Sequence, residues 1–348
     1  MTIQENIPLA PFTTLQVGGP ARYFAEAGSE AEVIEATQLA KNRQLPLFIL
    51  GGGSNLVVAD SGWPGLVLRV AIDGIISQNE KDTALFTAGA GVDWDSFVAH
   101  TVAANCAGVE CLSGIPGSVG GTPVQNVGAY GQEVSETIES VRALDLKKDR
   151  IVTLPKPTCG FRYRASIFNT TERGHYVILR VSYRLKHGAT PSLKYADLQE
   201  YFAGRTETPS LADVRVAVRQ IRRGKGMLIV DGDPNCRSAG SFFKNPVLRQ
   251  PQFKELEDRA NQRGLEIPNY RALGARRKVS AAWLVEHSGF SKGYMLGPAG
   301  ISQEHALALI NCGNARAADI VLLKEKIQQA VQATWGILLE TEPVFVGF

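Results

Sequence analysis

The stretch GIPGSVGGTPVQNVGAYG, residues 114–131, is the most informative part of this chain, together with GGGSN at residues 51–55. Glycine has no Cβ, so its backbone N–H groups can approach phosphate oxygens closely and it readily adopts positive φ. A glycine-rich run by itself is equally compatible with a tight turn. Two such runs, interleaved with Ser and Asn donors, predict a site for a pyrophosphate.

Neither run fits the common nucleotide-binding fingerprints. In the first, Leu56 occupies the position where the Rossmann pattern G-x-G-x-x-G requires its third glycine. The second has the spacing G-x-x-G-x-x-G, and Lys225 in RGKG lacks the Ser or Thr that follows the lysine of a P-loop. We therefore expect a dinucleotide site that is neither of the Rossmann nor of the Walker type.

Hydrophobic periodicity predicts a mixture of helices and strands. The helical period appears at residues 33–40, 94–102, 253–260, 281–287 and 320–336. Alternation or a short apolar run marks strands at residues 45–50, 177–185 and 343–348. Ser29, with capping-box spacing to Glu32, and Ser280 are the expected N-caps, and Gly108 is an expected C-cap. The elements show no regular βαβ repeat, so we expect an α+β fold.

The composition is that of a globular protein of two or three domains. The chain has 348 residues, of which 44% are hydrophobic and 20% charged, and this length exceeds one ordinary core. The formal net charge of +3 gives no reason to expect a nucleic acid as partner. The stretch 223–238, rich in Gly, Asp and Pro, is expected to be a linker or loop that enters the last domain.

The cysteines and the N-terminal residues indicate where in the cell the protein is expected to work. The cysteines lie at residues 106, 111, 159, 236 and 312. They include no C-x-x-C pair, so we expect neither a disulfide framework nor a metal site. Residues 1–11 lack the features of a leader, and no apolar run approaches the ~20 residues of a membrane span. We expect a cytoplasmic monomer without a membrane partner.

Several motifs follow one another in a family-specific order along nearly the whole chain. They are TLQVGGPA at 14–21, GGGSNLVV at 51–58, IPGSVGGTPVQNVGAYG at 115–131, SAGSFFKNP at 238–246 and LETE at 339–342. This ordered set resembles the UDP-N-acetylenolpyruvoylglucosamine reductases, the MurB family. In particular, it is similar to the subtype in which a loop tyrosine closes over the substrate.

The resemblance implies an α+β architecture with an FAD-binding domain of the vanillyl-alcohol-oxidase type. That domain would have two lobes, at residues 1–66 and 67–226, and the C-terminal strand 337–348 would return to the active site. Residues 227–336 would form a smaller α+β domain that binds the UDP-sugar.

The resemblance also implies a peptidoglycan-precursor reductase that carries bound FAD and uses NADPH. NADPH would reduce the flavin, and flavin N5 would pass hydride to C3 of the enolpyruvyl group of UDP-N-acetylenolpyruvoylglucosamine, giving UDP-N-acetylmuramate. The residues that would hold FAD are Gly51, Gly52, Gly53, Ser54, Asn55, Gly117, Ser118, Gly120, Gly121, Thr122, Asn126, Gly128 and Tyr130.

Three residues match the family's catalytic positions. Arg164, in FRYRASIF, would bind the substrate carboxylate through its planar guanidinium and stabilise the enolate-like charge. Glu342 would assist, partly neutral because two close anions do not both ionise readily. Ser241 would donate the proton to C2, but a serine hydroxyl is a poor acid, so Lys244 or backbone dipoles must help. Outside the motifs, each residue type is more often solvated or structural.

Further residues match positions that contact the substrate's nucleotide, diphosphate or carboxylate: Tyr195, Lys225, Lys244 and Asn245. Tyr195 would be the loop tyrosine that closes over the diphosphate. Arg222, Arg223 and Lys225 are equally compatible with a solvated basic cluster. We assign no role to His305.

Other functions stay open at this stage. Another FAD oxidoreductase of the same fold would need a flavin-tethering His or Cys near the glycine runs, and residues 1–99 contain no His. Ser241 to Lys244 satisfies the S-x-x-K of serine acylases, but neither S-D-N nor K-T-G follows. A nucleic-acid-binding module could use FRYR and RRGK, but the chain shows no RNP or KH pattern.

Overall fold

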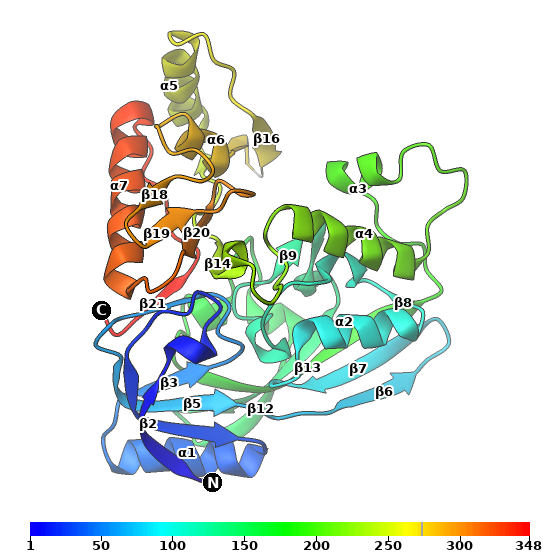
Figure 1. Ribbon diagram of the computed structural model, residues 1–348. Coiled ribbons are helices and arrows are strands. Elements are labelled where there is room, and N and C mark those ends of the chain that lie inside the picture. The colour runs from blue at the N-terminus through cyan, green and yellow to red at the C-terminus, as the bar shows by residue number, and fades with distance from the viewer. Residues whose placement is uncertain (273) are drawn as a thin grey trace. The chain divides into compact units, whose positions relative to one another are not determined.

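Helices and strands assemble into two units made of interleaved chain segments, in a computed structural model that describes residues 1–272 and 274–348 (Figure 1). The first unit contains Met1–Ile7, Ala21–Gly53 and Trp63–Gly224. The second contains Pro8–Pro20, Ser54–Gly62 and Lys225–Phe348. Most strand pairs are antiparallel, and the helices and strands follow no regular βαβ repeat, so the predicted α+β class is confirmed. The domain boundaries expected at residues 66 and 226 stay predictions.

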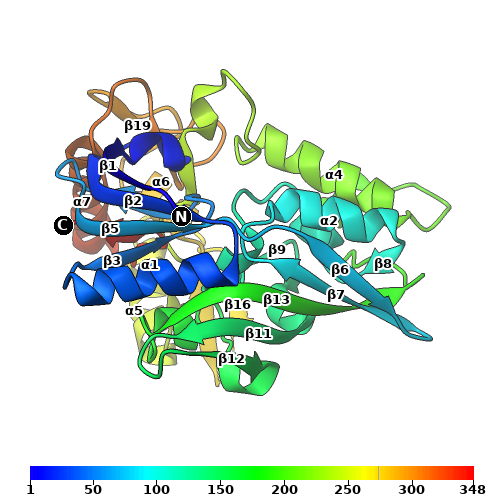
Figure 2. The same ribbon diagram turned by 90° about the horizontal axis from the view of Figure 1, so that it is seen from below.

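The first lobe of the first unit is a sheet of order β1-β2-β5-β3. Strands β2 and β3 both pair with β5 in parallel. Helix α1 lies along this sheet (Figure 2), and its buried Val33, Ala36 and Ala40 share a core with Leu66 and Leu68 of β5. The elements are β1 (Ile3–Pro8), β2 (Pro20–Ala27), α1 (Glu30–Asn42), β3 (Leu47–Leu50) and β5 (Trp63–Val70).

The second lobe is an antiparallel sheet of order β12-β11-β13-β7-β6, with β8 paired to the end of β13. The predicted alternation at 177–185 is confirmed, because every second residue of this central strand is fully buried. The strands are β6 (Ile75–Asn79), β7 (Thr83–Gly89), β8 (Cys106–Ala107), β11 (Ile138–Asp145), β12 (Arg150–Pro155) and β13 (Tyr176–His187).

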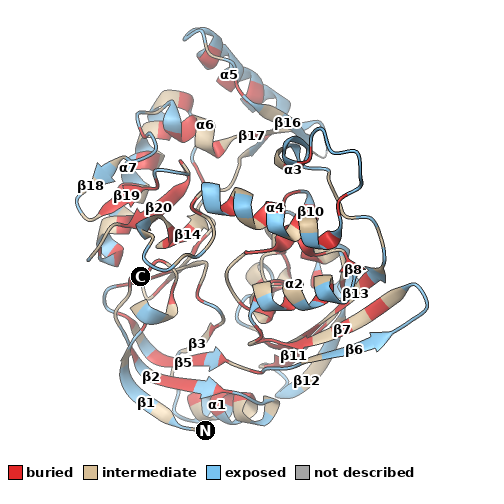
Figure 3. Ribbon diagram, turned by 45° about the vertical axis from the view of Figure 1, so that its right-hand side comes forward, coloured by how far each residue is buried: buried red, intermediate tan, exposed pale blue. Residues whose placement is uncertain are grey.

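Helices and short turns of the second lobe carry the glycine-rich stretch. Helices α2 and α4 lie side by side (Figures 2 and 3). The helices are α2 (Trp94–Ala103), α3 (Ala196–Tyr201) and α4 (Leu211–Gly224). The short elements are η2 (Glu110–Leu112), η3 (Val119–Gly121), β9 (Gly128–Ala129), β10 (Gln132–Glu133), η4 (Val134–Glu136), η5 (Lys156–Cys159) and η6 (Ile167–Asn169).

The second unit combines three small sheets with helices. Their orders are β14-β20-β19-β18, β15-β17-β16 and β21-β4. The strands are β4 (Leu56–Val58), β14 (Ser238–Ser241), β15 (Val247–Leu248), β16 (Asn269–Ala272), β17 (Arg276–Val279), β18 (Met295–Leu296), β19 (Ala299–Ile301), β20 (Ala308–Asn311) and β21 (Val344–Val346). The helices are η1 (Ala10–Phe12), η7 (Pro234–Cys236), α5 (Gln250–Asn261), α6 (Ala281–Glu286) and α7 (Ala317–Trp335). Buried residues line one side of α7 (Figure 3).

Most local signals are confirmed, and one is wrong. Ser29 and Ser280 cap α1 and α6 by accepting hydrogen bonds from backbone N–H groups three residues on. Gly108 is not the C-cap of α2, which ends at Ala103. Asn105 instead adopts the left-handed conformation at φ 54°, and the next residue, Cys106, pairs with His187 as the first residue of β8. A long-range strand pairing therefore ends this helix earlier than the local pattern indicates.

The described residues add two findings about membranes and metals. None of their helices is both long and apolar enough to cross a bilayer. No group of three or more His, Cys, Asp or Glu among them could hold a metal ion. The five cysteines are free thiols, and four of them are buried.

Candidate functional site

The two glycine runs meet inside the first unit. A Cβ on Gly52 would lie 2.5 Å from the Gly117 Cα and 2.7 Å from the Ser118 nitrogen, so any other residue would push the two loops apart. Gly53 has a φ of +64°, and Gly117 has a φ of +129°. Gly52 is required because the two loops contact each other there, and Gly53 and Gly117 are favoured by their positive φ. The two predicted phosphate loops therefore lie in direct contact.

The hydroxyl of Ser118 provides a test of whether an anionic ligand fits these loops. Its Oγ is buried without a hydrogen-bond partner and would lie 3.1 Å from a Cβ on Gly51. An unsatisfied buried hydroxyl costs about 1–3 kcal/mol, which a phosphate oxygen would relieve by accepting its hydrogen bond. A Cβ on Gly121, at the far end of the same run, would point into open space. The residues present therefore fit a pyrophosphate.

Two other predicted cofactor residues have structural partners. Thr122 Oγ1 is buried and lies 2.6 Å from Tyr183 Oη and 2.8 Å from the Val119 carbonyl oxygen. Gly120 is packed so tightly that a Cβ would lie 2.6 Å from the Ala90 Cβ. These two residues shape the loop from within.

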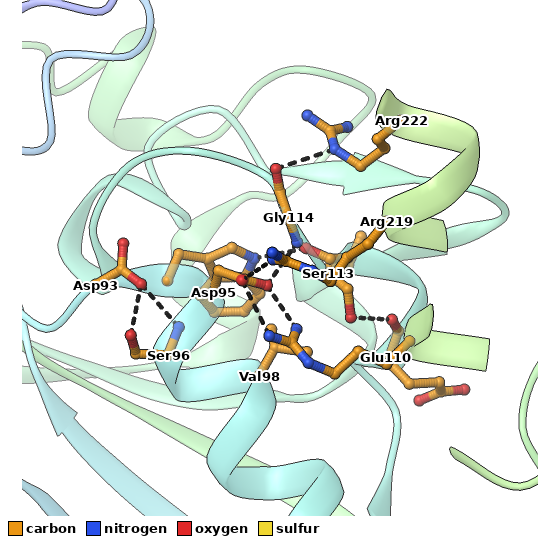
Figure 4. Close-up of polar contacts among 12 residues, drawn as sticks. Asp93, Asp95, Ser96, Val98, Glu110, Ser113, Gly114, Arg219 and Arg222 are labelled. Atoms are coloured by element: carbon orange, nitrogen blue, oxygen red, sulfur yellow. Dashed lines mark hydrogen bonds and ion pairs between the residues drawn. The ribbon is translucent and has the colours of Figure 1, made fainter. Parts of the chain in front are cut away.

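A group of charged side chains holds the start of the second glycine run (Figure 4). Asp95, in the first turn of α2, accepts a hydrogen bond of 2.6 Å from the Gly114 N–H. The same carboxylate is bound by Arg215 at 2.5 and 3.0 Å and by Arg219. Arg222 Nε donates to the Gly114 carbonyl oxygen at 3.0 Å. Both polar groups of the Gly114 backbone are therefore engaged, and we call this arrangement the Gly114 clamp.

The electrostatics of the clamp follow from burial and pairing. Burial opposes the ionisation of Asp95, but hydrogen bonds from Arg215 and Gly114 outweigh it, so the pKa of this carboxyl lies below its usual range. Burial lowers the pKa of the Arg222 guanidinium, whose side chain is only 5% exposed, and Tyr130 and Asp95 oppose that shift. The alternative of a solvated basic cluster therefore does not hold for Arg222, which is buried, whereas Arg223 is exposed.

The side chain of Asn126 is fully occupied by the protein. Its Nδ2 donates to Glu133 Oε2 at 2.7 Å and to the Arg162 carbonyl oxygen at 3.1 Å. Its Oδ1 accepts from the Ser135 N–H at 3.1 Å. Asn126 thus ties the second glycine run to the loop that carries the predicted catalytic arginine.

Arg164 lies against the end of that run. Its Nη2 donates to the Gly128 carbonyl oxygen at 2.9 Å, and its Cζ lies 5.3 Å from the centre of the Tyr163 ring. Asn169 Nδ2 donates to the Arg164 carbonyl oxygen at 3.2 Å. The residue itself has a φ of +53°, which costs a non-glycine residue about 1–2 kcal/mol. The surrounding hydrogen bonds maintain this conformation.

Tyr195 lies over the same region of the first unit. Its side chain is 43% exposed, and its ring meets the buried Tyr130 edge to face at a centroid distance of 5.3 Å. The preceding loop is anchored by Glu110, a buried carboxylate that accepts from the Ser192 N–H at 3.1 Å and from Gln132 Nε2 at 2.8 Å. The loop that precedes Tyr195 is therefore held to the rest of the first unit by a hydrogen bond to Glu110.

In the second unit, Ser241 has a histidine partner. Ser241 Oγ lies 2.9 Å from His305 Nε2. The pairing of β14 with β20 sets Ser241 opposite Ala308, and the Ala308 N–H donates to the His305 carbonyl oxygen at 3.0 Å. Sequence reasoning missed this contact because 64 residues separate the two side chains.

Backbone and side-chain contacts connect three further predicted residues of the second unit, Glu342, Asn55 and Lys244. The Glu342 N–H donates to the Phe242 carbonyl oxygen at 2.9 Å, next to Ser241. Asn55 Nδ2 donates to the Glu342 carbonyl oxygen at 3.3 Å. Lys244 Nζ lies 3.5 Å from the Glu340 carboxylate. The structure thus brings Ser241, Lys244, Glu342 and Asn55 into one neighbourhood.

Asn245 and Lys225 complete the set. Asn245 Oδ1 accepts from the Ala281 N–H at 2.9 Å, at the start of α6. Lys225 is half-buried and directly follows α4. The first unit contains Arg164, Tyr195 and all the predicted cofactor residues except Ser54 and Asn55. The second unit contains the other predicted residues, namely Ser54, Asn55, Lys225, Ser241, Lys244, Asn245 and Glu342.

Comparison with known families defines the class of protein. Residues 21–154 match the family model for an FAD binding domain. Residues 233–346 match the C-terminal domain of UDP-N-acetylenolpyruvoylglucosamine reductase. Together with the two glycine loops, these matches define a flavoprotein oxidoreductase whose cofactor is FAD, as the sequence predicted.

Individual relatives identify the family. UDP-N-acetylenolpyruvoylglucosamine reductase from Thermobifida fusca is 44% identical over 349 residues, covering 99% of this chain and 98% of that relative. The reductase of the same name from Streptomyces avermitilis is 44% identical and covers 99% and 96%. The crystal structure of UDP-N-acetylenolpyruvylglucosamine reductase (MurB) from Thermus caldophilus superposes with a TM-score of 0.68 at 26% identity, covering 99% and 100%. The chain belongs to the UDP-N-acetylenolpyruvoylglucosamine reductase family.

Proposed function

We propose that this chain reduces the enolpyruvyl group of UDP-N-acetylenolpyruvoylglucosamine to a lactyl ether, with NADPH as reductant, in the synthesis of peptidoglycan precursors. The observation that carries the proposal is that one chain joins an FAD binding domain to the C-terminal domain of this reductase family. Full-length relatives carry the same reductase name. The bound FAD would supply the hydride for the enolpyruvyl double bond, with NADPH as its source.

The two glycine loops would hold the pyrophosphate of FAD in the first unit. The contact of Gly52 with Gly117 and the unpartnered Ser118 hydroxyl support this assignment. Backbone N–H groups of such loops neutralise phosphate charge without a bulky side chain. The role of Thr122, Gly120 and Asn126 would be to shape these loops, since their contacts are within the protein.

Arg164 would bind the substrate carboxylate. Addition of hydride to C3 moves negative charge onto C2 and the carboxylate, and a fixed guanidinium stabilises that charge without reorganisation. The bond from Arg164 to Gly128 and the stacking on Tyr163 support a fixed position. A planar guanidinium also binds a carboxylate through two hydrogen bonds.

Ser241 would deliver the proton to C2, and Glu342 would stabilise the enolate. The backbone bond from Glu342 to the neighbour of Ser241 supports a shared location for these two residues. A carboxyl group that is partly neutral could donate a hydrogen bond to the enolate oxygen, whereas a carboxylate could not. Tyr195, Lys225, Lys244 and Asn245 would bind the nucleotide, the diphosphate or the carboxylate of the substrate.

An anaerobic two-step experiment tests the proposal. The purified protein loaded with FAD is reduced with NADPH and then mixed with UDP-N-acetylenolpyruvoylglucosamine, while the flavin absorbance is followed. We expect rapid reoxidation, and we expect Arg164→Ala to slow it by about 10²–10³-fold, the usual loss for a residue that stabilises transition-state charge. Glu342→Gln should change the pH dependence of the same step.

Arg162→Ala is the matched control, since this arginine lies in the same loop with an exposed side chain. It should leave the rate of reoxidation unchanged. A flavin that NADPH reduces but that does not respond to the UDP-sugar would exclude this substrate. A protein that takes up no FAD would refute the proposal as a whole.

A further inference from the structure

The proposed reaction leaves one chemical requirement unmet. A serine hydroxyl is a very weak acid, so a proton transfer from Ser241 to carbon leaves an alkoxide unless another group replaces the proton. The sequence suggests Lys244 and backbone dipoles as helpers, and Lys244 Nζ lies 3.5 Å from the Glu340 carboxylate. His305 contacts the Ser241 hydroxyl, with Nε2 lying 2.9 Å from Oγ.

The turn that carries His305 is held firmly in place. Ser302 is fully buried, and its Oγ donates to Asn235 Oδ1 at 3.0 Å. The same Asn235 oxygen accepts from the Gln303 N–H at 3.1 Å, and Ser302 Oγ accepts from the Glu304 N–H at 3.1 Å. A Cβ on Gly226 would lie 3.2 Å from Ser302 Oγ, so the segment after α4 packs directly on this turn. The imidazole is thus presented to the serine by a preorganised loop.

Charged side chains on the surrounding segments define the electrostatic setting. Glu304 neighbours the histidine in the turn, and Lys225 precedes the glycine that packs on it. Asp233 caps η7, the short helix that lies beside β20, and Lys244 follows β14. Both signs of charge are present on these segments. Histidine as a residue type can gain and lose a proton near neutral pH.

We infer that His305 is a positioning residue that supplies the proton which Ser241 passes on, an inference that rests on the proposed function. As the Ser241 O–H bond breaks and the proton bonds to C2, the Nε2–H bond of the His305 imidazolium breaks and its proton bonds to Ser241 Oγ. The serine therefore ends neutral, the imidazolium becomes imidazole, and water returns a proton to it between turnovers. No further reactant is needed.

The test compares His305→Gln with wild-type protein. Glutamine can still donate a hydrogen bond to Ser241, but it cannot titrate. In the reduced protein, His305→Gln should slow reoxidation by the UDP-sugar by about 10²-fold or more, in line with the contribution of one general acid. Wild type should decline in rate above about pH 6.5, the ordinary pKa of histidine, and the variant should lose this decline. Reduction by NADPH and the Kd for the UDP-sugar should change little.

His287→Gln is the control, because this exposed histidine of the same unit contacts Trp283 and no predicted site residue. A second readout does not depend on activity: imidazole ¹⁵N NMR of the FAD-loaded wild type should show Nε2 of His305 protonated, with a titration that shifts in Ser241→Ala. If reoxidation keeps its rate and pH profile in His305→Gln, the inference fails while the proposed function stands.

A wild-type protein that ignores the UDP-sugar would instead refute the proposed function itself. If His305→Gln does not fold, the NMR measurement decides alone. An Nε2 that stays unprotonated from about pH 5 to about pH 9 would overturn the inference, since such a nitrogen has no proton to supply.

Discussion

Ser118 shows how a single buried atom carries information about a ligand. Its hydroxyl lies beside Gly51 without a partner in the described structure. We expect Ser118→Ala to weaken FAD binding by about tenfold, the value of one hydrogen bond of about 1.4 kcal/mol. The apoprotein should unfold at an equal or slightly higher temperature, because the variant removes a buried polar group that the protein leaves unsatisfied.

These two measurements separate a ligand contact from a structural contact. A purely structural serine would lower the melting temperature of the apoprotein and leave the Kd for FAD unchanged. Thr122→Val is the comparison, because this hydroxyl is bound inside the protein to Tyr183 and Val119. Its loss should destabilise the apoprotein.

His175 forms a second residue-scale feature, with partners on both sides of its ring. Its Nε2 lies 2.7 Å from Asp145 Oδ1, its Nδ1 lies 2.5 Å from Glu172 Oε2, and its ring stacks on Tyr176 at 4.2 Å. Burial opposes the ionisation of Asp145, but the hydrogen bond from His175 outweighs it, and the pKa of Asp145 lies below its ordinary value. The pKa of Glu172 is also lowered, chiefly by its hydrogen bond with His175.

The stability linked to these carboxyls should depend on pH. A carboxyl with a lowered pKa in the folded state contributes stability above its unfolded pKa of about 4, and this contribution is lost as the pH falls further. His175→Gln should therefore melt at a lower temperature than wild type at pH 7, and the gap should shrink below about pH 4. Thermal melts across this range provide the measurement. A gap that stays constant with pH would contradict the linkage, and His287→Gln should show no gap.

At the scale of elements, helix α4 anchors the second glycine run. Its Arg215, Arg219 and Arg222 recur at helical spacing, so they share the face of α4 that meets α2. The spacing was visible in the sequence, but the partner carboxylate, Asp95, lies 120 residues away from Arg215. The sequence therefore shows the row of arginines but not the carboxylate that they bind.

The Gly114 clamp should couple helix packing to FAD binding. Asp95→Asn leaves Arg215 and Arg219 without their carboxylate, and we expect a loss of about 3 kcal/mol in the free energy of unfolding, typical for one broken partner of a partly buried pair. FAD affinity should fall as well, since Gly114 begins the phosphate loop. Chemical denaturation and flavin titration measure the two effects.

Glu26→Gln is the matched control for the clamp. The ion pair of Glu26 with Arg69 has a similar distance, 2.8 Å, but both side chains are about half exposed. Its loss should cost less than about 1 kcal/mol and should not affect FAD. If Asp95→Asn behaved like Glu26→Gln, the clamp would have no energetic role.

At the scale of the whole molecule, the second unit depends on segments far apart in the chain. Strand β4 pairs in parallel with β21, with Val57 opposite Phe345. Leu15, Val17 and Val57 are buried in one core with residues of α5 and α7. Asn311 Nδ2 also donates to the Leu15 carbonyl oxygen at 3.3 Å.

A fragment of residues 225–348 should therefore not fold by itself. Removing Leu15, Val17 and Val57 forfeits about 1.5–3 kcal/mol for each side chain, a sum comparable to the whole stability of a small domain. We expect the fragment to lack the near-UV circular dichroism and the cooperative melting of the full chain. A sharp melting transition in the fragment would show that residues 8–20 and 54–62 are dispensable.

The family could be predicted from the order of motifs and the fold class from periodicity, whereas the roles of the site residues stay predictions. Features that depend on contacts between distant residues escaped the local patterns for a common physical reason. Gly108 is not a helix cap because β8 pairs with β13, and Arg222 is not solvated because α4 packs on α2. The sequence suggests no contact for His305, because its hydrogen bond with Ser241 depends on strand pairing.

The sequence by itself determined whatever depends on a few neighbouring residues. The caps at Ser29 and Ser280 follow from local hydrogen bonds, and the alternation of β13 follows from the period of two. The preference for glycine at position 53 follows from its positive φ. The tertiary structure alone decided the long-range pairs: Gly52 against Gly117, Asp95 with Arg219, and Ser241 with His305. Such pairs arise from sheet register and core packing, which sum many weak contacts over the whole chain, so no local pattern encodes them.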